Sequence, residues 1–140
     1  MRVFLDANVL FSACRGAGAV RALLQLLEEG SHALVADAYV AEEARRNLAA
    51  KSGEAGLSTL QALLGRLELA GIQHAPSVPD EAIAWLVAKD QPVLQAAVAL
   101  RCDALVTGDK THFGSHYGKR VGGVLICSPV QLYQRIIDTA

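Results

Sequence analysis

The chain has 140 residues, a length that fits one domain at residues 1–140, because two separate cores would each be small. Hydrophobic residues make up 52% of it, enough for a packed core, and no apolar run approaches the roughly 20 residues of a membrane span. The formal net charge of −1 excludes binding of nucleic acid through overall positive potential, so any such contact is expected to be local.

The cysteines and the first residues bear on the cellular compartment. Cys14, Cys102 and Cys127 are odd in number and widely spaced, so they indicate neither a disulfide framework nor a Cys-x-x-Cys metal site. The first strand-like run begins at Arg2, which leaves no room for a secretion signal ahead of it. We therefore expect a soluble cytoplasmic protein with no membrane segment.

The first half of the chain alternates short apolar runs with longer stretches of helical spacing. The run that begins at Arg2 ends at Asp6, and Gly30 stops the first helical stretch. Asp37 is placed to be the N-cap of the next helix, and a stretch rich in glycine and polar residues then predicts a loop. The expected elements are a strand at residues 2–5, a helix at 18–29, a strand at 33–36, a helix at 38–50, a loop at 51–58 and a helix at 59–69.

The second half continues this alternation. Pro79 and Pro92 stand at the starts of helical stretches. Proline is tolerated there because the first backbone N–H groups of a helix make no hydrogen bond within the helix. The expected elements are an edge strand at residues 72–75, helices at 80–88 and 92–101, strands at 104–107 and 124–127, and a last helix at 129–137.

This order of elements predicts the fold class. Strands separated by helical stretches of about 10–15 residues favour right-handed crossovers and a mostly parallel sheet with helices on both faces. The chain is therefore expected to be α/β, a three-layer α/β/α sandwich. Ligands of such sheets bind beyond the carboxyl ends of the strands, so residues that follow strands are the first candidates for a site.

Three aspartates stand at positions of this kind. Asp6 follows the first strand directly, Asp109 lies two residues beyond the strand at 104–107, and Asp90 comes just before a helix start. Each alone has an ordinary alternative as a helix cap or turn residue, and that alternative stays open. Together, Asp6 and Asp109 are expected to point into one crevice.

The helix at residues 38–50 adds two adjacent glutamates. At about 100° per residue, its apolar stripe passes through positions 40, 44 and 48. Glu43 lies on the flank of that stripe, whereas Glu42 lies nearly opposite and is expected to pair with Arg46 at i,i+4. Glu43 is therefore the candidate for the crevice, and Glu42 is expected to be a solvated surface charge.

Several carboxylates in one crevice require a cation. At a separation of ~4 Å and an effective dielectric constant near 20, each pair repels by about 4 kcal/mol. Oxygen ligands suit Mg²⁺ or Mn²⁺ better than zinc, and such ions support phosphodiester hydrolysis. The basic residues expected near the rim of this crevice are Arg45, Arg46, Arg101, Lys110, Lys119 and Arg120.

Four segments carry a more specific pattern: VFLDANVL at residues 3–10, EARRNL at 43–48, Asp90 ahead of QAA at 95–97, and ALVTGDK at 104–110. In this order and spacing they resemble the PIN-domain nucleases, which include the toxins of many bacterial toxin–antitoxin pairs. The first and last segments are the more specific ones, and the resemblance spans nearly the whole chain.

The resemblance implies a fold, an oligomeric state and a role for each matched residue. It implies a five-stranded sheet in the order 3-2-1-4-5 and a tendency to form homodimers. Some relatives carry an extra acid shortly after the last aspartate, where this chain has Thr111 and His112, so one metal ion and two metal ions both remain open. The implied catalytic and metal-binding acids are Asp6, Glu43, Asp90 and Asp109, and the implied orienting residues are Asn8 and Thr107.

The function expected from this resemblance is Mg²⁺- or Mn²⁺-dependent endonucleolytic cleavage of RNA that leaves 5′-phosphate and 3′-hydroxyl ends. A single-stranded or looped RNA is the expected substrate, because splayed bases are what proteins usually read in RNA. The kinship also implies a small antitoxin protein as partner.

Two alternatives of other classes remain. One is a PIN-like module that binds RNA or protein and has lost catalysis. The other is phosphoryl transfer with Asp6 as nucleophile, although such phosphatases carry a second acid where this chain has Asn8. His112 and His116 have a spacing used for zinc, but glycine and serine between them break the helix that such a pair needs, so exposed loop residues or phosphate contacts are expected instead.

Overall fold

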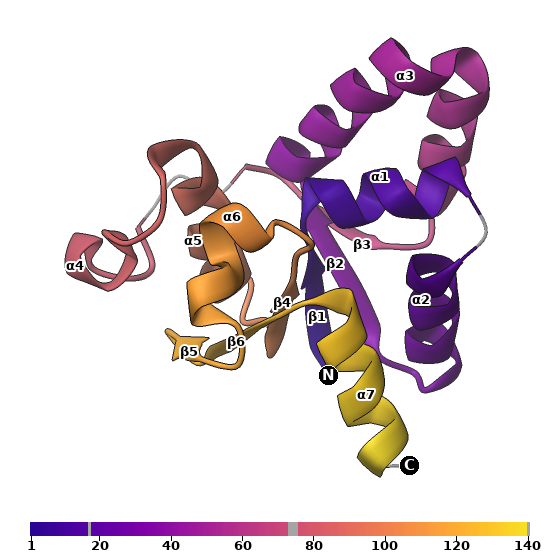
Figure 1. Cartoon of the computed structure of the whole chain (residues 1–140). Helices are drawn as coiled ribbons and strands as arrows, with labels where there is room; N and C mark the ends of the chain where they lie inside the picture. The colour runs from indigo at the N-terminus through magenta and orange to yellow at the C-terminus, as the bar shows by residue number, and fades with distance from the viewer. Residues whose placement is uncertain (17, 73–75, 140) are drawn as a thin grey trace.

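A computed structural model of the chain describes residues 1–16, 18–72 and 76–139 (Figure 1). The strands are β1 (Arg2–Leu5), β2 (Ala33–Asp37), β3 (Glu68–Ala70), β4 (Ala104–Val106), β5 (Arg120–Val121) and β6 (Val124–Cys127). The α-helices are α1 (Ala7–Arg15), α2 (Ala19–Glu29), α3 (Ala38–Leu64), α4 (Asp80–Ile83), α5 (Gln91–Ala99), α6 (Lys110–Phe113) and α7 (Pro129–Thr139), and two short 3-10 helices are η1 (Ala88–Asp90) and η2 (Gly114–His116).

The strands form one sheet in the order β3-β2-β1-β4-β6-β5, and only β5 runs antiparallel to its neighbour. The predicted α/β class, the mostly parallel sheet and the 3-2-1-4-5 order are confirmed, with β6 as the fifth predicted strand. The short strand β5 adds an unpredicted edge. Helices flank the sheet, with α2 and α7 packed together on one side and α5 against β4 on the other (Figure 1).

The centre of the sheet is fully apolar, as a sheet covered on both faces requires. Val3, Phe4 and Leu5 of β1 and Leu105 and Val106 of β4 have no exposed surface. Among the described helices, no single one is long and apolar enough to cross a membrane, although the bent pair α1 and α2 meets that test by length and composition.

Several predicted bounds are wrong. The loop expected at residues 51–58 is helical, and the change of direction in α3 comes from Gly53 alone, whose φ of 60° and ψ of −150° are not helical. The helix expected at 59–69 ends at Leu64, because β3 begins at Glu68. The edge strand expected at 72–75 is not seen at Ile72, and the rest of it lies outside the described residues.

Two further corrections concern helices. The segment after Asp6 forms α1, which was not predicted, and the helix expected at residues 80–88 is reduced to the single turn of α4 followed by η1. These corrections matter for the site, because α1 and η1 both supply residues that line its walls.

The turn between β5 and β6 provides a test of the packing. Gly122 and Gly123 both have positive φ, 55° and 84°, but a Cβ on Gly122 would lie 2.8 Å from Val78 Cγ1 and 2.9 Å from Val98 Cγ2, whereas a Cβ on Gly123 meets nothing within 4 Å. Gly123→Ala is expected to cost about 1 kcal/mol of unfolding free energy from backbone strain alone. Gly122→Ala adds an overpacking cost of about 1–3 kcal/mol, measurable by denaturant unfolding, and equal losses in the two variants would contradict this packing.

Candidate active site

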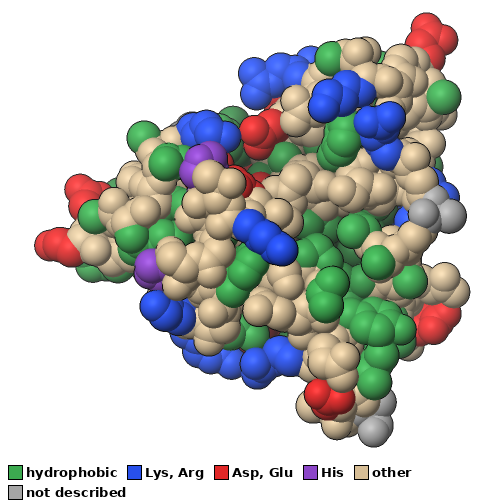
Figure 2. All heavy atoms as spheres, in the orientation of Figure 1, with side chains coloured by type: hydrophobic (Ala, Val, Ile, Leu, Met, Phe, Trp, Pro, Cys, Tyr) green, Lys and Arg blue, Asp and Glu red, His purple; other side chains and the backbone are tan. Residues whose placement is uncertain are grey.

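A cleft of about 460 Å³ opens beyond the carboxyl ends of β1 and β4. Figure 2 shows acidic side chains in this hollow between α3 and α6, with Lys and Arg side chains on either side. The residues that line it are Asp6, Ala7, Asn8, Phe11, Ser12, Glu43, Asn47, Lys51, Lys89, Asp90, Gly108 and Asp109.

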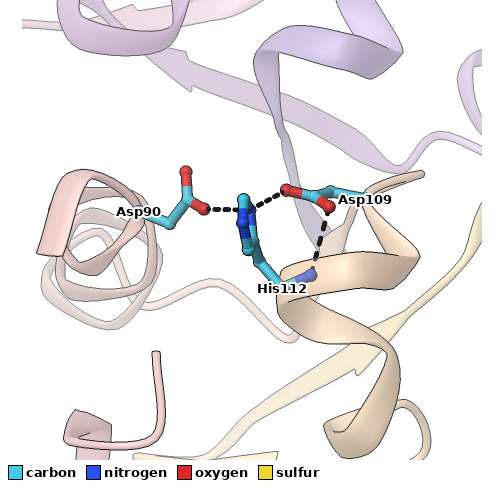
Figure 3. A group of neighbouring side chains, drawn as sticks. All are labelled: Asp90, Asp109 and His112. Carbon is cyan, nitrogen blue, oxygen red and sulfur yellow. Dashed lines mark hydrogen bonds and ion pairs between the residues drawn. The ribbon is translucent and has the colours of Figure 1, made fainter. Parts of the chain in front are cut away.

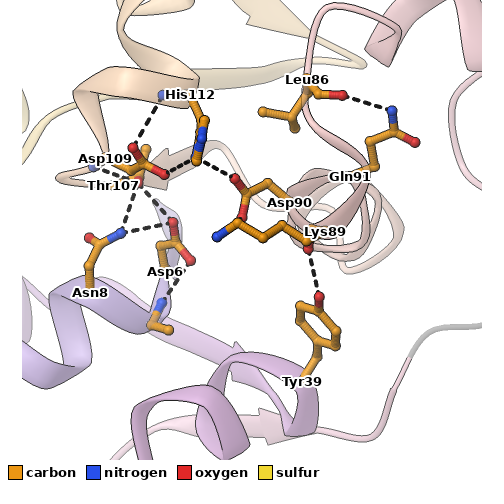
Figure 4. Close-up of polar contacts among 11 residues, drawn as sticks. Asp6, Asn8, Tyr39, Leu86, Lys89, Asp90, Gln91, Thr107, Asp109 and His112 are labelled. Carbon is orange, nitrogen blue, oxygen red and sulfur yellow. Dashed lines mark hydrogen bonds and ion pairs between the residues drawn. The ribbon is translucent and has the colours of Figure 1, made fainter. Parts of the chain in front are cut away.

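Asp6 is the most enclosed of the four acids. It is buried at the start of α1, where its Oδ1 accepts a hydrogen bond of 2.8 Å from the N–H of Ala7. Its Oδ2 accepts hydrogen bonds from the Thr107 hydroxyl at 2.8 Å and from Asn8 Nδ2 at 3.1 Å (Figure 4). Asp6 is therefore both a helix cap and a cleft residue, and both Asn8 and Thr107 donate hydrogen bonds to its carboxylate.

The environment of Asp6 disfavours its charged form. The pKa of Asp6 is raised from its ordinary 3.8 to about 6. Burial is the largest cause, hydrogen bonds from Thr107 and Ala7 oppose it, and the nearby carboxylates of Asp90 and Glu43 add to the rise. Neutral donors, not a positive side chain, keep Asp6 in place, so its charge is left for a cation to balance.

Asp90 reaches the cleft from η1, on the opposite wall. The hydroxyl of Tyr39 in α3 donates to the Lys89 carbonyl at 2.6 Å, and Gln91 Nε2 donates to the Leu86 carbonyl at 2.8 Å (Figure 4). The Asp90 side chain does not cap α5, although it stands at the N-cap position. Among the described residues, Asp90 Oδ2 is the buried side-chain oxygen that has no hydrogen-bond partner.

Asp109 and His112 come from one turn of helix. Asp109 caps α6, accepting a hydrogen bond from the N–H of His112 at 3.2 Å. The ring of His112 turns back, so that its Nδ1 lies 2.7 Å from Asp109 Oδ2 and 2.9 Å from Asp90 Oδ2 (Figure 3). The expectation that His112 is an exposed loop residue is therefore wrong. The D-x-x-H spacing at a helix start was the signal for it in the sequence.

The two glutamates separate as the helical phase predicted. Glu43 lines the cleft, whereas Glu42 points away from it and is half exposed. The partner predicted for Glu42 is wrong: Glu42 pairs with Arg45 at i,i+3, with Oε1 2.6 Å from Arg45 Nη2, and not with Arg46. This hydrogen-bonded pair lowers the pKa of Glu42.

The side chains of the cleft fit a divalent cation. The ligand atoms of Asp90, Asp109 and His112 lie within 4.8 Å of one another, while Asp6 and Glu43 line the same cleft outside that group. A buried carboxylate oxygen without a hydrogen-bond donor, as Asp90 Oδ2 is, costs free energy unless a positive charge faces it. Lys89, with Nζ 3.8 Å from Asp90 Oδ1, compensates the other oxygen only.

Two lysines stand at the cleft that were not among the expected rim residues. Lys51 and Lys89 line it, and Lys51 Nζ also lies 5.6 Å from the centre of the Phe11 ring, above its face. The Arg15 guanidinium approaches the same ring at 5.4 Å. The cleft thus combines an acidic floor with local positive charge and one aromatic side chain.

A comparison with known families decides the kinship. A family model described as PIN domain matches residues 2–111. The chain belongs to the PIN-domain family. No curated protein matches it significantly.

Several solved structures are similar to this chain in shape and distant from it in sequence. A chain in the crystal structure of VapBC2 from Rickettsia felis bound to a promoter DNA fragment has a TM-score of 0.67 and 17% identity, covering 91% of this chain and 98% of that one. A chain of DNA-bound VapBC from Salmonella typhimurium has a TM-score of 0.64 and 15% identity, covering 92% of this chain and 98% of that one. Mycobacterium tuberculosis VapC20, a sarcin-ricin loop cleaving toxin, has a TM-score of 0.59 and 9% identity, covering 85% of this chain and 98% of that one. At these identities the PIN domain and its neighbours share the fold.

The raised pKa of Asp6 makes a prediction for the protein without metal. As pH rises from 4 to 7, the Asp6 carboxyl loses its proton in the unfolded chain before it does so in the folded chain. The contribution of protonated Asp6 to the unfolding free energy is therefore complete at low pH and is lost as pH rises through about 6. The loss from this group is on the order of 3 kcal/mol. Asp6→Asn cannot ionise, so its unfolding free energy relative to wild type should rise by a similar amount over this range.

Denaturant unfolding with a chelator at several pH values measures this difference. The control is Asp80→Asn, which removes an exposed carboxyl outside the cleft and should parallel the wild type. A difference between Asp6→Asn and wild type that does not change with pH would show that Asp6 ionises normally in the folded chain.

Proposed function

We propose that this PIN domain is a divalent-metal-dependent endoribonuclease. The observation that carries the proposal is the convergence of Asp6, Glu43, Asp90 and Asp109 on one cleft at the carboxyl ends of β1 and β4. These residues would hold Mg²⁺ or Mn²⁺, which supplies activation of water and neutralisation of charge on a phosphodiester when bound.

The residues of the chain have distinct parts in this chemistry. The neutral donors Asn8 and Thr107 hold the Asp6 carboxylate at a fixed place, so no rearrangement is needed when the substrate binds. Lys51 and Lys89 attract the phosphate backbone at the mouth of the cleft. Lys51 and Arg15 lie over the Phe11 ring, so a splayed base of single-stranded RNA would stack there by displacing one of these cations.

The substrate class follows the same reasoning. VapC20, which shares the fold, is described as a toxin that cleaves the sarcin-ricin loop. We propose a looped or single-stranded RNA as substrate here, hydrolysed to 5′-phosphate and 3′-hydroxyl ends in the cytoplasm. A local basic rim suits such a substrate, because a net charge of −1 provides no long-range attraction.

Partners are proposed on similar grounds. Neighbouring structures are VapBC assemblies, two of them bound to DNA, which supports a small antitoxin protein as partner of this chain. A homodimer is supported by apolar side chains on the outer face of α7, where Val130 is 70% exposed and Tyr133 and Ile137 are also exposed.

Asp6→Asn and Asp109→Asn should each reduce cleavage of a looped RNA by at least about a hundredfold, because each removes a charge from the site while keeping nearly the same shape. The assay compares Mg²⁺, Mn²⁺ and chelator, and circular dichroism checks folding. Asp80→Asn, outside the cleft, should cleave as the wild type does. Undiminished cleavage by both site variants at matched metal concentration would falsify the assignment, and a wild type that binds metal without cleaving RNA would indicate a binding module.

The adjacent glutamates give a matched pair of variants. Glu43→Gln should cut the cleavage rate at least tenfold, a loss of about 1.4 kcal/mol of transition-state stabilisation, and should weaken metal binding. Glu42→Gln removes the same charge from the same turn of α3 but outside the cleft, so its rate should stay at the wild-type level. The reverse result would mean that Glu42, not Glu43, belongs to the site.

A further inference from the structure

The His112 ring faces two carboxylates with a single nitrogen. Its Nδ1 lies 2.7 Å from Asp109 Oδ2 and 2.9 Å from Asp90 Oδ2 (Figure 3). Of the two histidines considered from the sequence, only His112 does this, because His116 stacks flat on Trp85 with ring centres 3.5 Å apart. His112 therefore contacts two of the four acids, although the four-acid set does not include it.

One proton cannot satisfy this arrangement. A hydrogen on Nδ1 that is directed to Asp109 Oδ2 leaves Asp90 Oδ2 without a donor, although the two atoms are close. The Asp90 side chain is only 9% exposed, so water does not compensate this oxygen freely. Three electron-rich atoms converge here, and a cation among them would satisfy all three.

The spacing of these atoms suits an octahedral ion. Adjacent ligand atoms that each lie 2.0–2.2 Å from an ion are about 3 Å apart, close to the two nitrogen–oxygen distances seen here. Asp109 and His112 occupy positions i and i+3, a spacing that metal sites on helices also use. The N–H of His112 binds Asp109 Oδ1 and the next residue, Phe113, is fully buried, so the backbone holds both ligands on one turn.

We propose that His112 Nδ1 is a third metal ligand beside Asp90 and Asp109, which makes this a mixed oxygen and nitrogen site. The inference rests on the proposed function in placing a divalent ion in this cleft. Both Mg²⁺ and Mn²⁺ prefer oxygen ligands, but Mn²⁺ is a transition metal, at the weak end of the Irving–Williams order, and accepts an imidazole nitrogen more readily than Mg²⁺ does. His112 thus favours Mn²⁺ over Mg²⁺.

Calorimetric titration of the full chain with Mn²⁺ and with Mg²⁺ tests this preference. His112→Ala should weaken Mn²⁺ binding at least about tenfold and Mg²⁺ binding by less than about threefold. His112→Asp, which replaces the nitrogen by oxygen, should bind Mg²⁺ at least as well as the wild type and lose the preference for Mn²⁺. His116→Ala, a control in the same segment, should bind both ions as the wild type does.

Pulsed electron paramagnetic resonance of the Mn²⁺-loaded wild type gives a direct signature. Coupling to an imidazole ¹⁴N should appear in the wild type and in His116→Ala and should vanish in His112→Ala. No step of this experiment involves RNA cleavage, so it stands or falls apart from the nuclease assignment, and the wild-type spectrum decides even if a variant fails to fold. The proposal is overturned if the wild type binds no Mn²⁺ or if its Mn²⁺ spectrum shows no ¹⁴N coupling. It is also overturned if His112→Ala binds Mn²⁺ as tightly as the wild type or more tightly, because the ring would then occupy the place of the cation.

Discussion

Parallel pairing of β1 with β4 places Leu5 opposite Val106. Asp6 and Thr107 therefore leave the sheet side by side, and the Thr107 hydroxyl reaches Asp6 Oδ2 at 2.8 Å. A slip of one residue in this register would turn each side chain to the other face of the sheet. The buried apolar side chains of both strands prevent that slip, so the packing of the core also fixes the first carboxylate of the cleft.

The cleft holds Asp6 without an opposite charge beside it. Backbone N–H groups and the neutral side chains of Asn8 and Thr107 supply the hydrogen bonds of Asp6, and no Lys or Arg side chain makes an ion pair with it in the described part of the chain. Its raised pKa is the consequence, since burial and neighbouring carboxylates both disfavour its charge. A lysine paired with Asp6 would stabilise the protein without metal and would leave less room for a cation.

The sequence predicted the parts of this architecture that depend on local patterns. The buried strands and the helical phase that separates Glu43 from Glu42 follow from periodicity alone, and both agree with the structure. Helix α1 was missed although its buried positions 9, 10, 13 and 14 have helical spacing, because it follows β1 with no turn between them. The extent of α3 was missed because the glycines at 53 and 56 resemble a loop, yet only Gly53 leaves the helical region.

The site was harder to predict where it depends on contacts between distant segments. His112 is close to Asp109 in sequence, but only the fold brings Asp90 to the other side of its ring. That approach depends on α3, whose Tyr39 hydroxyl binds the Lys89 carbonyl next to Asp90. The first turn of α3 is in turn set by Asp37, a buried N-cap that accepts a hydrogen bond from the N–H of Val40.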